Sequence, residues 1–137
     1  DALPILKEQY SFDELVKIIE ELRGEHGCPW DKKQTHKTLI PCLREESEEV
    51  VEAIEKNDME NLMEELGDVL LQVVMHARIG EENKKFDIND VITGICQKMI
   101  RRHPHVFGGI QFQDEEELLL NWEEIKRQEK QLKKKAK

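Results

Sequence analysis

Residues 37–56 read KTLIPCLREESEEVVEAIEK, and residues 58–78 read DMENLMEELGDVLLQVVMHAR. In both stretches apolar side chains recur every three or four residues, which is the period of an amphipathic helix. Asn57 and Asp58 interrupt this pattern, and aspartate is a residue type that caps the start of a helix. Two helices joined by so short a connection pack as antiparallel neighbours. The two stretches therefore predict a helical hairpin.

The same helical period extends over most of the remaining chain. Ser11 and Glu14 have the S-x-x-E spacing of a capping box, and Asn89 or Asp87 can cap a later helix. The expected helices cover about residues 12–24, 37–56, 58 to 78 or 83, 89–101, and from 114 onward. The sequence thus predicts an all-α fold, an antiparallel bundle of about five helices. We expect a single domain over residues 1–137, with its core at about 12–130 and flexible ends at 1–11 and 131–137.

The composition excludes several classes of protein. With 30 acidic and 21 basic residues the net charge is −9, which disfavours a general nucleic-acid binder. No stretch approaches the roughly 20 apolar residues of a membrane span, and no signal peptide is evident. The three cysteines are an odd number and widely spaced, so we expect a reduced, cytoplasmic protein. Only 5% of residues are aromatic, which predicts a small hydrophobic core. A small core favours oligomerisation, because more apolar surface is then buried between subunits.

Acidic residues interrupt the apolar face of the helix predicted at 37–56. On a helical wheel Glu46 falls near the middle of the apolar arc, and Glu49 lies at its edge, three residues on. A lone carboxylate on an apolar face costs several kcal/mol unless it is paired or neutralised, so solubility does not explain it.

The next helix repeats this arrangement. Glu65 lies beside the apolar arc, and Asp68 follows at the same spacing of three residues. Four converging carboxylates repel one another, and a hard divalent cation relieves that repulsion. Ligands that are all oxygen favour Mg²⁺ or Mn²⁺ over zinc. Acidic pairs are common in a chain with 30 acidic residues, so each pair alone is a weak signal. A di-iron site is disfavoured because neither pair has the Glu-x-x-His form.

These residues resemble a known family. Residues 45–49 (EESEE) followed by 64–68 (EELGD) are similar to the E-E-x-x-E … E-x-x-D pattern of MazG-type nucleoside triphosphate pyrophosphohydrolases. Three flanking motifs are similar as well, and they raise the specificity of the match. They are CPWD at 28–31, KMIRRHPHVF at 98–107 and NWEEIK at 121–126. The likeness covers about residues 12–130.

The resemblance implies an all-α oligomer, a homodimer or larger, that hydrolyses nucleoside triphosphates to NMP and pyrophosphate with Mg²⁺. It assigns the metal ligands to Glu46, Glu49, Glu65 and Asp68. It matches the phosphate-contacting basic pair to Lys98 and Arg102, and a nucleotide-contacting aromatic to Trp122. Residues bordering the nucleotide would include Cys42, Asn61 and Glu64. The general base stays open among Glu45, Glu46 and Glu49. Some relatives have two such domains, whereas this chain has one.

Two other interpretations stay open at the level of sequence. The same scaffold could act on dUTP, dCTP or phosphoribosyl-ATP, because those pyrophosphohydrolases share the carboxylate pattern. Alternatively, the chain is a non-catalytic helical module for oligomerisation or regulation, whose acidic pairs are surface charge. Nucleotide turnover and metal binding distinguish the three.

Overall fold

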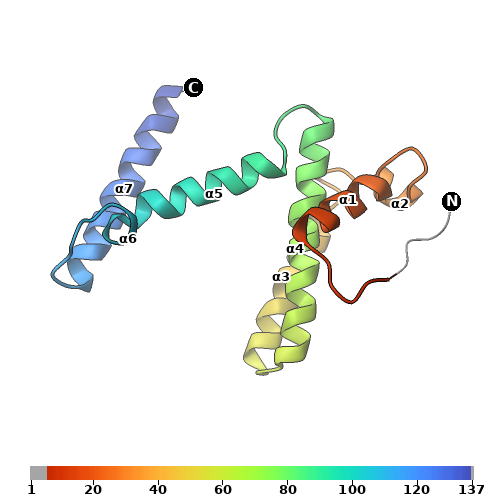
Figure 1. Ribbon diagram of the computed structural model, residues 1–137, viewed down its shortest axis with the longest axis horizontal. Helices are drawn as coiled ribbons and strands as arrows, with labels where there is room; N and C mark the ends of the chain where they lie inside the picture. The colour runs from red at the N-terminus through yellow and green to blue at the C-terminus, as the bar shows by residue number, and fades with distance from the viewer. Residues whose placement is uncertain (1–5, 137) are drawn as a thin grey trace. The chain divides into compact units, whose positions relative to one another are not determined.

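The computed structural model describes residues 6–136, and within that range all regular secondary structure is helical. The five longer helices lie close to the predicted ranges (Figure 1). They are α1 (Phe12–Leu22), α3 (Ile40–Glu55), α4 (Met59–Glu82), α5 (Ile88–Arg102) and α7 (Glu115–Ala136). The all-α prediction is confirmed, and α7 continues as a helix into the lysine-rich segment expected to be flexible. Residues 1–5 and 137 lie outside the described residues.

The predicted count of about five helices omits two short ones. Both α2 (Pro29–Lys32) and α6 (Pro104–Phe107) are four-residue helices within segments predicted as loops. Each begins with proline, whose fixed φ suits the first helical turn and whose missing N–H costs nothing there. These helices are too short to show a hydrophobic period, and proline is typical of loops, so the sequence pattern predicts loops in both segments. Within the described residues the structure has seven helices.

Local chemistry sets the ends of the predicted hairpin. The Asp58 side chain accepts a hydrogen bond from the backbone N–H of Asn61 at 3.2 Å, which caps α4 as expected. Asn57 has φ +53°, a left-handed conformation that asparagine tolerates and that ends α3. One predicted cap needs correction, because α5 begins at Ile88, which places Asn89 inside the helix and leaves Asp87 directly before it.

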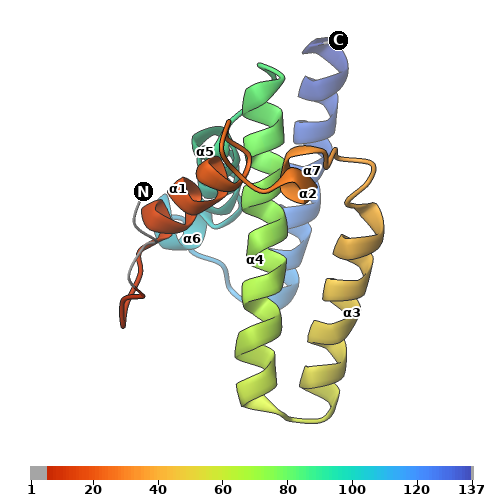
Figure 2. The same cartoon turned by 90° about the vertical axis from the view of Figure 1, so that its right-hand side faces the viewer.

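The chain divides into two compact units, residues 1–88 and 89–137. In the first unit, α3 and α4 run antiparallel side by side, and α1 crosses α4 (Figure 2). The predicted helical hairpin is therefore confirmed. The second unit contains nearly all of α5, together with α6 and α7. The expectation of a single domain over residues 1–137 stays a prediction.

The core of the first unit lies at the crossing of α1 and α4. Its buried side chains are Ile19, Leu39, Val74, Met75 and Ile79. Only part of the apolar arc predicted for α4 is buried: of its members, Ala77 alone is fully buried. The predicted arc consists of Leu62, Leu66, Val69, Leu70, Val73 and Ala77. The side chains left exposed from that arc include Leu66 at 50%, Leu70 at 41% and Val73 at 40%. The chain therefore presents an apolar face on α4 that its own first unit does not cover.

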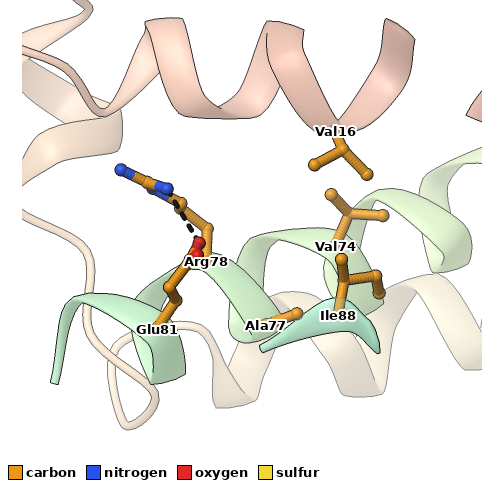
Figure 3. Close-up of a pocket in the computed structure, with 6 residues that line it drawn as sticks. All are labelled: Val16, Val74, Ala77, Arg78, Glu81 and Ile88. Carbon is orange, nitrogen blue, oxygen red and sulfur yellow. Dashed lines mark hydrogen bonds and ion pairs between the residues drawn. The ribbon is translucent and has the colours of Figure 1, made fainter. Parts of the chain in front are cut away.

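A small cavity lies beneath α1. Val16 of α1 points toward Val74 of α4, and Ile88 closes one side (Figure 3). Arg78 pairs with Glu81 at 2.8 Å along the rim. The cavity holds about 10 Å³, near the minimum that one water molecule needs, so it is a packing defect rather than a ligand site. In the described part of the chain, no helix combines the length and apolar character needed to cross a bilayer.

Candidate active site

Four carboxylates converge between α3 and α4. Glu46 and Glu49 extend from α3, and Glu65 and Asp68 extend from α4. One oxygen atom from each side chain lies within 4.8 Å of one from each of the others. We call these four residues the four-carboxylate cluster. The predicted convergence of two acidic pairs on neighbouring helices is confirmed.

Local sequence accounts for this convergence. Residues three apart lie on one side of a helix, so each acidic pair faces the same way. Antiparallel packing of α3 on α4 brings the two pairs to the same height, and all four residues are half-buried. Oε2 of Glu46 and Oε2 of Glu65 are buried without a hydrogen-bond donor in the described residues. A buried acceptor without a partner costs free energy of folding, and a bound cation would remove that cost.

The pKa values of Glu46 and Glu65 are raised in this crowded cluster. The pKa of Glu46 is raised by burial, with further contributions from the charges of Asp68 and Glu49. The pKa of Glu65 is raised to about 7, mainly because its carboxyl group shares a hydrogen bond with Glu49. Burial and repulsion add to that effect. Without a cation, the cluster therefore retains a proton near neutral pH.

The residues fit a magnesium or manganese ion. Oxygen ligands at 2.0–2.1 Å from Mg²⁺ lie at most about 4.2 Å from one another. The oxygen atoms of the four-carboxylate cluster lie within 4.8 Å of one another, so modest side-chain movement brings them to a shared ion. The donor set is oxygen only, which favours hard divalent cations. Figure 2 shows the paired helices that would hold such an ion.

We expect Mg²⁺ binding to the cluster to strengthen with pH between about 6 and 8 and to release about one proton. Glu65 is protonated below its pKa of about 7, so protons compete with the metal there and leave the site as pH rises. Calorimetric titration at several pH values, in buffers of different ionisation enthalpy, measures both quantities. Glu65→Gln should remove most of the pH dependence, and equal affinity at pH 6 and 8 in the wild type would contradict the assignment.

Comparison with known proteins identifies the family. The MazG nucleotide pyrophosphohydrolase domain matches residues 34–107, a segment that contains the entire four-carboxylate cluster. This chain belongs to the MazG family. A crystal structure of a MazG-related protein from Thermotoga maritima matches with a TM-score of 0.70 at 35% identity, covering 84% of this chain and 98% of that one.

Curated MazG relatives share much of the sequence. The nucleoside triphosphate pyrophosphohydrolase/pyrophosphatase MazG of T. maritima is 52% identical over 90% of this chain and 47% of its own length. The nucleoside triphosphate pyrophosphohydrolase of Escherichia coli K12 is 45% identical over 86% of this chain and 45% of its own. The uncharacterized protein YabN of Bacillus subtilis is 53% identical over 93% of this chain and 27% of its own. The chain thus spans less than half the length of these relatives.

The other MazG-type residues expected in the first unit lie on the same two helices. On α3, Cys42 is half-buried against the core cluster, one turn before Glu46, and Glu45 is exposed. On α4, Asn61 is half-buried in the first turn and Glu64 is exposed beside Glu65. Their roles at the nucleotide stay predictions.

Three MazG-type residues lie in the second unit, and the structure links two of them. The indole Nε1–H of Trp122 on α7 donates a hydrogen bond to the backbone carbonyl of Arg102 on α5. Lys98 is half-buried one turn before Arg102, on the same side of α5. Within the described residues Lys98 has no ion pair. Their contacts with a nucleotide stay predictions.

A carboxylate that the sequence did not reveal binds Arg102. Glu129 Oε1 accepts a hydrogen bond from Nη2 of Arg102 at 2.9 Å, and its Oε2 accepts one from Nε of Arg101 at 2.6 Å. A signal for it existed, because Glu129 lies seven residues after Trp122 and so on the same face of α7. Among many exposed glutamates this spacing alone did not distinguish it.

A histidine pair that the sequence did not predict joins His36 to His76. Nδ1 of His36 lies 2.7 Å from Nδ1 of His76, so one proton joins the two rings. The rings are nearly parallel, 8° apart. Burial lowers the pKa of His76, with the charge of His36 as a second cause. The pair fastens the segment before α3 to α4, which carries half of the four-carboxylate cluster.

Proposed function

We propose that this chain hydrolyses nucleoside triphosphates between the α and β phosphates, with Mg²⁺ or Mn²⁺, to NMP and pyrophosphate. The observation that supports this most strongly is the four-carboxylate cluster, which lies inside the segment matching the MazG domain. Curated relatives named nucleoside triphosphate pyrophosphohydrolase add support. Metal binding explains why four carboxylates meet between two helices, whereas a merely charged surface does not require them to meet.

In this proposal Glu46, Glu49, Glu65 and Asp68 bind the metal and hold it against the triphosphate. Bound Mg²⁺ would polarise phosphate oxygens and lower the pKa of a nearby water. A carboxylate oxygen not used for ligation takes the proton of the attacking water. Glu45, Glu46 and Glu49 are the candidates for this general base.

In this proposal, basic and aromatic residues of the second unit bind the nucleotide. Lys98 and Arg102 bind the phosphates and stabilise the negative charge that develops on departing pyrophosphate. Trp122 contacts the nucleotide, while Cys42, Asn61 and Glu64 border it. The spacing of Lys98 and Arg102 supports their joint role, because residues four apart share one face of α5.

We further propose that the protein works in the cytoplasm as a homodimer or a larger homo-oligomer. Leu66, Leu70 and Val73 on α4 are 40–50% exposed, and Met63 is 71% exposed. A contiguous apolar surface of this kind is typical of an interface between subunits. Sedimentation equilibrium measures the oligomeric state directly, and a monomer at micromolar concentration would contradict it.

A panel of ribo- and deoxyribonucleoside triphosphates, with dUTP, dCTP and phosphoribosyl-ATP included, tests the proposed function. We expect NMP and pyrophosphate in equal amounts, and a loss of activity of at least about a hundredfold in excess chelator, because the metal contributes several kcal/mol to the transition state. Chromatography identifies the nucleotide product, and a coupled assay quantifies pyrophosphate.

The other outcomes have distinct meanings. Release of orthophosphate, or full activity without metal, would reject the proposed chemistry. Turnover of dUTP, dCTP or phosphoribosyl-ATP alone would keep the metal site and change the substrate. No turnover together with no heat of Mg²⁺ binding would favour a non-catalytic helical module.

A further inference from the structure

The side chain of Arg102 has an unusual set of partners in the second unit. Its Nη2 donates to Glu129 at 2.9 Å, and within the described residues Glu129 is the acceptor for this guanidinium. Its Nε is buried and has no acceptor there. A guanidinium has five N–H donors in a rigid fork. Glu129 therefore binds Arg102 through Nη2, and the other N–H donors of this guanidinium have no acceptor within the described residues.

The backbone of Arg102 is fixed independently of its side chain. Its carbonyl accepts the indole N–H of Trp122, and the Trp122 ring meets His103 edge-on, with ring centres 5.5 Å apart. His103 in turn lies within hydrogen-bond distance of the carbonyl of Met99, at 2.6 Å. The hydrogen bond and the ring contact to Trp122 thus join the end of α5 to α7 and fix the backbone at Arg102.

Glu129 is chemically suited to hold an arginine. Its side chain is 15% exposed, and its two oxygens divide between Arg101 and Arg102. The hydrogen bond from Arg102 is the main cause that lowers the pKa of Glu129 to about 2, with Arg101 contributing as well. Glu129 therefore stays ionised throughout the physiological range. A charged, half-buried pair of this kind loses less side-chain entropy when it binds an anion, because the arginine is already ordered.

The exposure of the two arginines distinguishes their roles. The side chain of Arg101 is 48% exposed, whereas that of Arg102 is 24% exposed and shares its face of α5 with Lys98. Arg101 contributes a second positive charge that offsets the charge of Glu129. The group as a whole remains cationic, since two arginines pair with one carboxylate. An anion therefore remains attracted to the unused donors of Arg102.

We infer that Glu129 is a positioning residue for phosphate binding: it orients the guanidinium of Arg102 toward the phosphates of the nucleotide. The inference rests on the proposed function, in which Arg102 binds phosphate. Glu129 itself does not touch the substrate. Its contribution is to present unused N–H donors of Arg102 in a fixed direction before the phosphate arrives, which is preorganisation of a charge-stabilising group.

The test is a double-mutant cycle with Glu129→Ala and Arg102→Ala in the full chain. We expect Glu129→Ala to lower kcat/KM for a nucleoside triphosphate by about tenfold to a hundredfold, as outer-shell partners do at other sites. In the Arg102→Ala background the same substitution should change kcat/KM by less than about threefold, because its target is gone. Glu129→Gln, which retains an acceptor oxygen, should recover part of the loss, and it serves if the alanine variant does not fold.

The control is Glu124→Ala on the same helix, which breaks the exposed pair with Arg127 and should leave kcat/KM unchanged. Equal losses from Glu129→Ala with and without Arg102 would overturn the inference, because a merely structural role lowers activity in both backgrounds. Full activity of Glu129→Ala would overturn it as well. An inactive wild type would remove the proposed function and this inference together, so the two failures are distinguishable.

Discussion

Asp68→Asn should lower kcat for nucleoside triphosphate hydrolysis by about a thousandfold or more. The substitution removes one negative ligand from the four-carboxylate cluster while retaining the shape of the side chain. A bound metal contributes several kcal/mol of transition-state stabilisation, and each 1.36 kcal/mol corresponds to a factor of ten. Pyrophosphate release at saturating Mg²⁺ measures the loss.

The stability of the same variant separates loss of metal from loss of fold. Ligand at a hundred times its Kd stabilises a protein by about 2.7 kcal/mol, so Mg²⁺ should raise the Tm of the wild type by several degrees. Asp68→Asn should lose most of this shift. Without metal it should be at least as stable as the wild type, because one of four repelling charges is gone.

Glu48→Gln is a matched control for this prediction. Glu48 lies on α3 one residue before Glu49, yet it is exposed and is not a member of the cluster. The same loss of charge should there leave both turnover and the Mg²⁺ response intact. Near-normal rates in Asp68→Asn would show that the four carboxylates do not bind the catalytic metal.

The cluster could be predicted because its geometry follows from local periodicity. A spacing of three residues places Glu46 with Glu49, and Glu65 with Asp68, whatever the rest of the chain does. The short turn at Asn57 then leaves antiparallel packing as the simplest arrangement. No long-range information was needed, and the structure confirms the result.

The buried face of α4 could not be predicted in the same way. Its apolar residues surround much of the helix, so the period alone did not show which of them would face the core. Val74, Met75 and Ile79 are buried in the core cluster where α1 crosses α4, whereas Leu66 and Leu70 remain exposed. The choice depends on tertiary packing, which also overrides local preference in other helical proteins.

Long-range ion pairs could not be predicted from the sequence either. Arg102 and Glu129 are separated by 27 residues, and Arg23 and Glu82 by 59. With 30 acidic residues available, nothing in the sequence indicates which of them each arginine will meet. Only the fold selects the partner, so these pairs are where the structure adds most to the sequence.

Arg23→Met should lower the free energy of unfolding by about 3–5 kcal/mol, the cost of breaking a buried ion pair from one side. The side chain of Arg23 is only 6% exposed. It binds both carboxylate oxygens of Glu82, at 2.8 and 2.9 Å, and also donates to the carbonyls of Asp31 and Gln34, at 2.5 and 3.1 Å. Methionine fills similar space but cannot donate a hydrogen bond to any of these acceptors. Urea denaturation measures the change.

The pH dependence provides an independent check. Hydrogen bonds from Arg23 are the main cause that lowers the pKa of Glu82 below its ordinary value of 4.5. A carboxylate with a lowered pKa stabilises the fold above its unfolded pKa, and that contribution is lost as pH falls through the folded value. The difference between wild type and Arg23→Met should therefore be full at pH 7 and shrink below about pH 4.5.

Arg127→Met provides the matched comparison, because Arg127 also pairs with a glutamate, Glu124, but on an exposed surface. That pair should contribute no more than about 1 kcal/mol. Arg23 is not a member of the four-carboxylate cluster, so Arg23→Met should retain the Mg²⁺-dependent rise in Tm. A loss of that rise with unchanged unfolding free energy would mean that Arg23 acts on the metal site, and the stabilising role argued for it would be wrong.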